Sequence, residues 1–361
     1  MIDRRQPKST MAFMQNTWYP AAWADELGPT TLLARTIAAT PVVMFRTEQA
    51  GMAALLDRCP HRFAPLSRGR KHAGGIACGY HGLAFDAAGT CIDNPHGAVT
   101  RALRVGAYPC VERHEAVWLW LGDRDRADPA LIPDLSFIDR APAAAKSHGY
   151  LPTAADYRLG VDNIMDLSHV DYLHPNTLGG GALTRSKATL TQDDVSITIS
   201  WIVNDHMAPP AFATNLPDPT GPADVWTNVT WYAPGVMVLE AGAAPAGRPR
   251  SEGVNSFSLH AMAPETHRTT HYFFANTRTF KLDDAQFNEA LSAFLFGIFS
   301  GDDKPMLEAQ QSRMGDRDFW DLKPALLSID AGAVAARRRL DQLIAREQAE
   351  AQARRPPGNV E

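Results

Sequence analysis

Residues 59–81 read CPHRFAPLSRGRKHAGGIACGYH and contain two short loops, each with one cysteine and one histidine. The first loop is Cys59-Pro-His61 and the second is Cys78-Gly-Tyr-His81. The proline and glycines beside these residues favour tight turns. Two such loops that face each other would place two thiols and two imidazoles around a metal centre. This stretch therefore predicts a metal site in a small, turn-rich domain.

The distribution of the four ligands favours one kind of centre. In a Rieske [2Fe–2S] cluster, two cysteines bind one iron and two histidines bind the other, and each loop here supplies one ligand of each type. A zinc site uses the same residue types, but its usual spacing keeps the cysteines together and the histidines together. The interleaved order of Cys59, His61, Cys78 and His81 favours the cluster, with zinc as the alternative.

Length and composition exclude several classes of protein. A chain of 361 residues fits about two domains. Its net charge of -5 provides neither a basic surface for nucleic acid nor a polybasic surface for anionic lipid. The N-terminus lacks the apolar segment of a secretory signal, and no apolar run approaches the ~18 residues needed to span a membrane. We expect a cytoplasmic protein, in which Cys91 and Cys110 are buried residues without a disulfide.

Strand-like segments dominate both halves of the chain. Residues 11–122 contain short runs separated by turns, and the polar, proline-containing stretch 123–135 is expected to be a linker. Further strands are expected at 196–203, 225–232, 235–240, 255–262 and 270–280. Helical patterns occur around 156–173, around 283–314 with a break at Gly301, and near 331–354.

These segments predict an α+β protein with two domains. We expect an all-β domain over 11–125 and a catalytic domain over 136–345 with an antiparallel sheet. The N-terminus can also contribute to the catalytic domain. Residues 1–10 and 350–361 are expected to be disordered tails.

The stretch DYRLGVDNIMDLSHVDYLH, which ends at His174, carries a second group of candidate ligands. Asn163, Asp166 and His169 follow one another at i,i+3 spacing and would lie on one side of a helix. Pro175 disfavours helical geometry at His174, so the chain can leave the helix there and bring a second imidazole beside the first. Two histidines and one carboxylate form the facial triad of non-haem Fe(II) oxygenases. Spacing alone does not select the carboxylate, because 40 acidic residues compete.

Together these segments resemble the Rieske non-haem iron aromatic-ring oxygenases, in particular the vanillate O-demethylase and dicamba monooxygenase group. The resemblance extends from Met11 to about residue 345. It rests on the motifs DRCPHRFAPLSRG, CGYHGLAFD, NPHG, VDNIMDLSHVDYLH, HYFF and DKPMLEAQ. It implies a Rieske β domain followed by a helix-grip domain built on an antiparallel sheet.

The resemblance also implies roles for single residues. His169, His174 and Asp303 match the ligands of a mononuclear Fe(II). Asp166 matches a carboxylate that bridges to a cluster histidine of the neighbouring subunit, which implies a ring-shaped homotrimer. Asn163 matches a polar residue close to the iron.

The third iron ligand is selected by the family motif. Asp302 is adjacent, but the motif matches Asp303. An acidic residue two positions before Pro305 suits a helix N-terminus, which is consistent with the choice of Asp303.

One position departs from the family pattern. In the dicamba enzyme an asparagine and a histidine hold the carboxylate region of the substrate. The alignment places His260 at the histidine but Leu239 at the asparagine, so one polar anchor is lost. His260 is expected to contact the substrate, with a structural strand histidine as the alternative.

The implied activity is that of the oxygenase component of a multicomponent monooxygenase. It uses O₂ and electrons that originate from NAD(P)H and arrive through a ferredoxin and/or a flavin-dependent reductase. No Gly-x-Gly-x-x-Gly fingerprint occurs in a strand–helix setting. By analogy the substrate is a small, acidic, methoxylated aromatic compound that is O-demethylated with release of formaldehyde. The alternatives are hydroxylation of a ring or of another methyl group and, outside enzymes, a Rieske electron carrier or a zinc-binding module.

Overall fold

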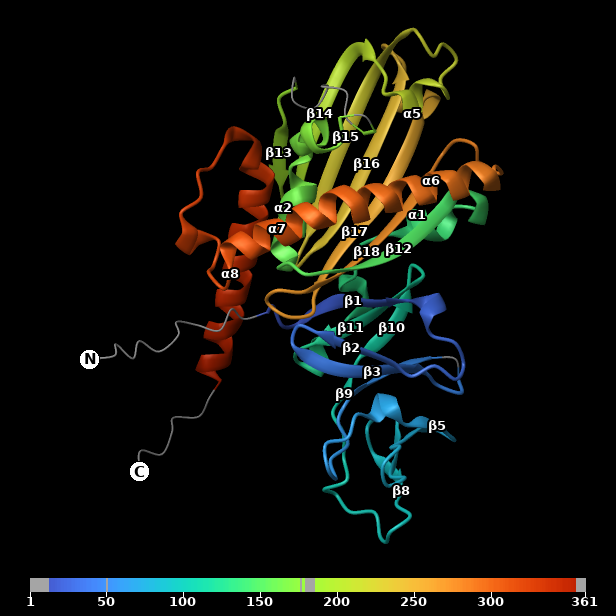
Figure 1. Ribbon diagram of the computed structural model, residues 1–361, viewed down its shortest axis with the longest axis vertical. Helices are drawn as coiled ribbons and strands as arrows, with labels where there is room; N and C mark the ends of the chain where they lie inside the picture. The colour runs from blue at the N-terminus through green and yellow to red at the C-terminus, as the bar shows by residue number, and fades with distance from the viewer. Residues whose placement is uncertain (1–12, 50, 176, 179–185, 355–361) are drawn as a thin grey trace, which may run out of the picture.

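The computed structural model describes residues 13–49, 51–175, 177–178 and 186–354. Figure 1 shows a β-rich N-terminal part next to a larger sheet that helices cross on one face. No helix among the described residues is both long and apolar enough to cross a membrane.

The N-terminal part contains three small antiparallel sheets. One consists of β1 (Thr17–Trp23), β11 (Ala116–Leu121) and β10 (Cys110–Arg113), in that order. The second consists of β2 (Leu33–Ile37), β3 (Thr40–Arg46), β4 (Met52–Leu56) and β9 (Ala107–Tyr108). The third consists of β5 (Arg70–His72), β6 (Gly75–Ala77), β7 (Ala84–Asp86) and β8 (Cys91–Asp93).

The second part is built on a sheet of seven antiparallel strands. Their order is β12 (Lys146–Thr153), β18 (Thr270–Arg278), β17 (Val254–Pro264), β16 (Val236–Pro245), β15 (Pro222–Tyr232), β14 (Ser196–Met207) and β13 (Thr189–Gln192). The helices are α1 (Ser136–Arg140), α2 (Tyr157–Met165), α3 (Val170–Leu173), α5 (Pro210–Ala213), α6 (Ala285–Ile298), α7 (Lys304–Met314) and α8 (Ala331–Ala353). This architecture agrees with the predicted α+β class.

Side-chain alternation gives the large sheet two different faces. On β17, Leu259 and Ala261 pack in one core together with Trp18 and Trp120 of the N-terminal part. The intervening His260 points to the opposite face, where its ring lies 5.5 Å from that of Phe299, the residue after α6. Helices cover this face of the sheet (Figure 1). The face that carries His260 is therefore the one on which a site between sheet and helices would lie.

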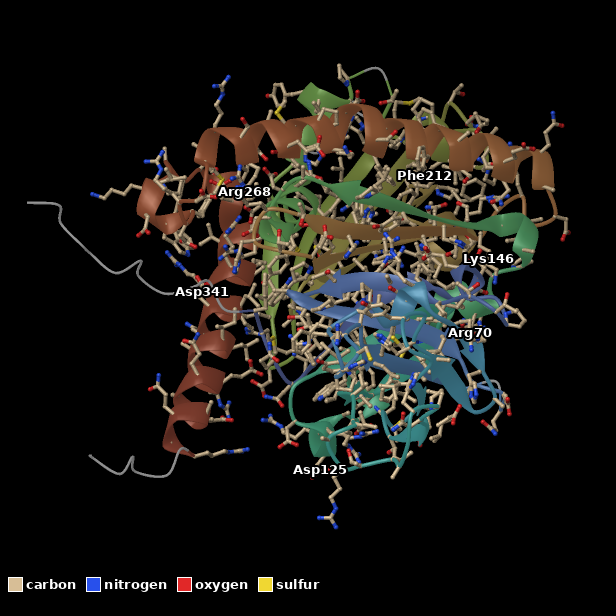
Figure 2. The ribbon with its side chains drawn as sticks, turned by 60° about the horizontal axis from the view of Figure 1, so that its bottom comes forward. Arg70, Asp125, Lys146, Phe212, Arg268 and Asp341 are labelled. Carbon is tan, nitrogen blue, oxygen red and sulfur yellow. The ribbon has the colours of Figure 1, made fainter. Side chains whose placement is uncertain are left out.

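Lys146 is labelled in Figure 2 at the junction of the two parts, where its ammonium contacts the carboxylate of Glu115.

The first described residues pack on the second part. Phe13 and Met14 contact the core between the large sheet and its helices, and the backbone N–H of Gln15 donates to Glu347 of α8 at 2.6 Å. The stretch 123–135, expected as a linker, is anchored because Ile132 and Leu135 are buried in the shared core.

The first expected helix is divided. Over 156–173, α2 ends at Met165 and Asp166 adopts an extended conformation, with φ -128° and ψ 93°. The carboxylate of Asp166 accepts a hydrogen bond from the backbone N–H of Ser168 at 2.9 Å and caps a 3₁₀ turn over Leu167–His169. The prediction of one continuous helix was wrong, because an aspartate that caps its own following turn competes with helix continuation.

The expected break at Gly301 is absent. A π-helical turn, Phe299–Asp303, joins α6 directly to α7. A glycine inside a helix costs stability but does not end it when the surrounding turns are held. Asp303 lies at the N-cap position of α7, as predicted, but its backbone is itself helical and its carboxylate caps no backbone N–H.

The prediction that a disordered C-terminal tail begins at residue 350 was wrong, because residues 350–353 are helical. Helix α8 continues to Ala353, and Arg346 and Glu350 pair across one turn at 3.1 Å. Residues 355–361, like the expected tail at 1–10, lie outside the described residues.

Candidate metal centres

The two cysteine–histidine loops are closed by matching backbone hydrogen bonds. The N–H of Cys59 donates to the carbonyl of Ala64, and that of Cys78 to the carbonyl of Leu83, both at 2.8 Å. The second loop depends on glycine, because a Cβ at Gly79 would lie 2.6 Å from the carbonyl oxygen of Arg68. These hydrogen bonds and the close approach at Gly79 constrain the shape of the loops.

The four predicted cluster ligands form two pairs. Cys59 and Cys78 are each 2% exposed and contact each other through their side chains. His61 and His81 lie closer to the surface, with ring centroids 4.5 Å apart. Two buried thiols and two outer imidazoles suit a two-iron cluster in which each pair binds its own iron.

A single zinc ion fits this arrangement less well. Among the described residues, the group of three or more histidine, cysteine or acidic side chains placed to hold one ion lies elsewhere, at His169, His174 and Asp303. Burial raises the pKa of the Cys59 thiol to about 11. The Cys78 side chain adds to this increase, and the backbone N–H of His61 opposes it. A bound cation is thus needed to hold Cys59 as a thiolate at neutral pH.

The other cysteines and nearby histidines make structural contacts. Cys91 is buried, and Cys110 is partly buried with a thiol pKa raised by burial to about 12. His96 Nε2 lies 2.9 Å from the backbone carbonyl of His81, and His114 Nδ1 lies 2.6 Å from the carboxylate of Asp139. Cys91 is buried as expected, whereas Cys110 is less buried than the sequence predicted.

The second constellation gathers at the junction of two distant segments. His169 ends the 3₁₀ turn after α2, His174 follows α3, and Asp303 ends the π-helical turn before α7. One ligand atom from each residue lies within 4.8 Å of the other two. Asp303 Oδ1 is 3.5 Å from His169 Nε2 and 3.2 Å from His174 Nε2. His174 has φ -120° and ψ 43°, so it leaves the helix as its position before Pro175 predicts.

The charges of this triad already support one another. Burial lowers the pKa of His169, but hydrogen bonds to Asp303 and to the backbone of Asp166 outweigh it and the net pKa is raised. Burial raises the pKa of Asp303, but its contact with His169 and the charge of His174 leave it below the ordinary value. The Asn163 amide donates to Asp303 Oδ1 at 3.1 Å. Two imidazoles and one carboxylate in this arrangement form a donor set suited to a divalent cation.

Asp166 lies beside the triad. Its backbone carbonyl is 2.6 Å from His169 Nδ1, while its carboxylate caps Ser168. Asn163, Asp166 and His169 all line a cavity of about 640 Å³. The expected common side of these three residues is therefore present although the helix ends at Met165. The cavity is bounded by α2, α7, α8 and the segment that precedes α8.

His260 lies on the sheet face that looks toward the triad. It is 3% exposed, its Nδ1 is 2.7 Å from the hydroxyl of Tyr272, and its ring lies 5.5 Å from that of Phe299. Burial lowers its pKa to about 4, against the charge of Asp303. His260 is therefore neutral at pH 7. Leu239 pairs with Ser258 on the adjacent strand and so shares this face.

Sequence reasoning missed the role of Tyr272, which lies in the HYFF run and faces His260. The alternation of β18 could have placed it on the helix-covered face, because Tyr272 pairs with Met262, two residues from His260.

Comparisons with known proteins identify the families of both parts of the chain. Residues 17–108 match the Rieske [2Fe-2S] domain family, and residues 153–346 match the vanillate O-demethylase oxygenase C-terminal domain family. The dicamba O-demethylase oxygenase component of Stenotrophomonas maltophilia is 36% identical over 92% of this chain and 98% of its own length. The chloroacetanilide N-alkylformylase oxygenase component of Rhizorhabdus wittichii is also 36% identical, over 93% of this chain and 97% of its own.

The chain belongs to the Rieske non-haem iron oxygenases. The crystal structure of dicamba monooxygenase bound to 3,6-dichlorosalicylic acid superposes with a TM-score of 0.87, at 35% identity, over 94% of this chain and 99% of that one. The vanillate O-demethylase oxygenase subunit of a Pseudomonas species is 32% identical over 94% of this chain and 98% of its own. The expected fold class is confirmed.

This Rieske oxygenase is thus an enzyme, the oxygenase component of a multicomponent monooxygenase. Its cofactors are a [2Fe–2S] cluster and a mononuclear iron, and its electrons come from a separate redox partner.

Proposed function

We propose that Cys59, His61, Cys78 and His81 bind the [2Fe–2S] cluster, and that His169, His174 and Asp303 bind the catalytic Fe(II). The observation that supports the iron site best is the convergence of two imidazoles and one carboxylate within 4.8 Å, from segments about 130 residues apart. When bound, such an iron supplies the open coordination positions at which O₂ is activated. The proposed domain boundaries are 11–125 and 136–345.

The residues around the triad have supporting roles in this proposal. The Asn163 amide, 3.1 Å from Asp303 Oδ1, orients that carboxylate. Asp166 fixes the imidazole of His169 through its backbone carbonyl at 2.6 Å. These contacts hold two candidate ligands in their binding orientation before a metal arrives, which is how surrounding groups raise metal affinity.

The reaction we propose is O-demethylation of a small aromatic substrate. O₂, two electrons and two protons convert the aryl methyl ether to a hemiacetal and water, and the hemiacetal then collapses to a phenol and formaldehyde. The support is the similarity to relatives that act on dicamba and vanillate, together with the site on the helix-covered face of the sheet.

The substrate would lie between the triad and His260. Phe299 and Phe274 provide apolar ring faces there, with centroids 5.0 Å apart. His260 Nδ1 is engaged by Tyr272, so Nε2 is the ring nitrogen left to contact a polar substituent. An acidic substituent remains part of the proposal by analogy, although Leu239 provides no amide to hold it.

We further propose that electrons pass between chains of a homotrimer. In Figure 1 the strands that carry the cluster loops, β5 to β8, lie at the far end of the long axis from α2 and α7. The cavity at Asp166 offers a place where a neighbouring chain's cluster loops could approach the iron. Asp166 would then form the connection between the two centres.

Formaldehyde release measured together with O₂ consumption tests the proposed reaction. The iron-replete protein would be assayed with a surrogate reductase, NADH and methoxybenzoates including vanillate, each matched with its unmethoxylated counterpart. We expect formaldehyde in step with O₂ for at least one methoxylated compound. O₂ consumption that yields a hydroxylated product without formaldehyde would overturn the demethylase assignment. Asp303→Ala is the control and should yield no formaldehyde.

A further inference from the structure

Two consecutive carboxylates contact the two nitrogens of one imidazole. His174 Nε2 lies 3.2 Å from Asp303 Oδ1, and His174 Nδ1 lies 3.1 Å from Asp302 Oδ2. In a regular α-helix, side chains of consecutive residues point about 100° apart. Both carboxylates nevertheless reach the same ring from the π-helical turn that links α6 to α7. Such turns widen the helix and are frequent at functional sites.

The two histidines are supported differently. His169 Nδ1 contacts the backbone carbonyl of Asp166, only three residues earlier in the chain. His174 comes after α3 has ended, so no helix holds its ring, and its side chain is 1% exposed. Its Nδ1 contact comes from a carboxylate 128 residues away. Asp302 therefore supplies to His174 what the local backbone supplies to His169.

Asp302 is available for this contact. The nearest cation in sequence, Lys304, pairs with Glu308 at 2.7 Å. The Asp302 side chain is 44% exposed, so one face is solvated while one oxygen reaches the buried ring. A solvated carboxylate bears a smaller desolvation penalty than a buried one.

We propose that Asp302 is a positioning residue of the iron site. It accepts a hydrogen bond from the Nδ1–H of His174, which fixes the tautomer whose Nε2 lone pair faces the metal position beside Asp303. A carboxylate on the outer nitrogen also makes the imidazole a better donor. This inference rests on the proposed iron ligation by His169, His174 and Asp303.

The test is Fe(II) affinity, measured anaerobically by chelator competition on cluster-loaded protein with Asp302→Asn and Asp302→Ala. Loss of an outer contact of this kind weakens metal binding about 10- to 100-fold, which we expect for Asp302→Ala. Asp302→Asn keeps an oxygen acceptor of the same size and should lie between Asp302→Ala and wild type. Glu289→Gln, which removes one exposed negative charge from α6, is the matched control and should stay within about twofold.

Thermal unfolding of the iron-free proteins separates positioning from general damage. We expect all three variants to unfold close to the wild-type temperature, because Asp302 is partly exposed and contacts His174 through one oxygen. Affinity for Fe(II) unchanged in Asp302→Ala, or lowered only in parallel with its unfolding temperature, would overturn the inference. If wild type itself bound no third iron while keeping its cluster, the proposed ligand triad would fail along with it.

Discussion

The guanidinium of Arg337 donates to both carboxylate oxygens of Asp162, at N–O distances of 2.6 to 2.8 Å. The contact joins α8 to α2, the helix that carries Asn163 and ends just before Asp166. The Arg337 side chain is 4% exposed and lies over the ring of Phe319 at 4.2 Å. One C-terminal residue therefore holds the helix from which the proposed iron site begins.

Arg337→Met should destabilise the protein, because it leaves the Asp162 carboxylate without its partner. Breaking a buried pair typically costs about 3 kcal/mol or more of unfolding free energy. Urea unfolding of the metal-free protein measures this loss. Arg338→Met, at the exposed neighbouring position, is the control and should change stability by less than about 0.5 kcal/mol. Equal losses in the two variants would contradict the role of Arg337.

His260 should make stability depend on pH. Its pKa is about 4 in the folded protein, below the ordinary value of 6.5. The unfolded chain therefore takes up a proton between these values while the folded chain does not, and stability is lost as pH falls from 6.5 toward 4. Between pH 7 and pH 5 wild type should lose about 2 kcal/mol more unfolding free energy than His260→Gln. Identical pH dependence in the two proteins would show that His260 is not held neutral.

Leu239→Asn should restore a polar anchor beside His260. Leu239 faces Ser258 across the β16–β17 pair, on the helix-covered face of the sheet. A new amide donor to a carboxylate should lower the KM of a carboxylated substrate about tenfold and leave its methyl ester unchanged. Steady-state kinetics on the matched acid and ester measure the effect. Leu190→Asn, on the same face but on the edge strand β13, is the control. An equal decrease in KM for the acid in this variant would contradict the prediction.

Variants that lack different centres should complement each other if electrons pass between chains. Cys78→Ser should lose the cluster, and Asp303→Ala should lose the catalytic iron. In a random 1:1 trimer mixture, about one quarter of the interfaces join an intact cluster to an intact iron site, so about one quarter of wild-type activity should return. Activity that stays at zero in verified mixed trimers would mean that each cluster serves its own chain.

The candidate ligands could be selected from the sequence, whereas the contacts that surround them could not. Cys59 and His61 are two residues apart, and so local spacing reveals them, whereas Asp303 lies 129 residues from His174 and was selected only through the family motif. The contacts of Asp302 and Arg337 depend on how distant helices pack, which no local pattern encodes. The π-helical turn replaced the break expected at Gly301 because tertiary contacts override the weak preference of one glycine.

Iron and acid-labile sulfide counts on wild type and Asp303→Ala test the central claim most directly. A cluster plus one catalytic iron predicts about three irons and two sulfides per chain in wild type. Asp303→Ala should retain about two irons and two sulfides, with an unchanged visible cluster spectrum and no turnover. Zinc without sulfide in wild type, or a third iron that stays bound in Asp303→Ala, would contradict the account.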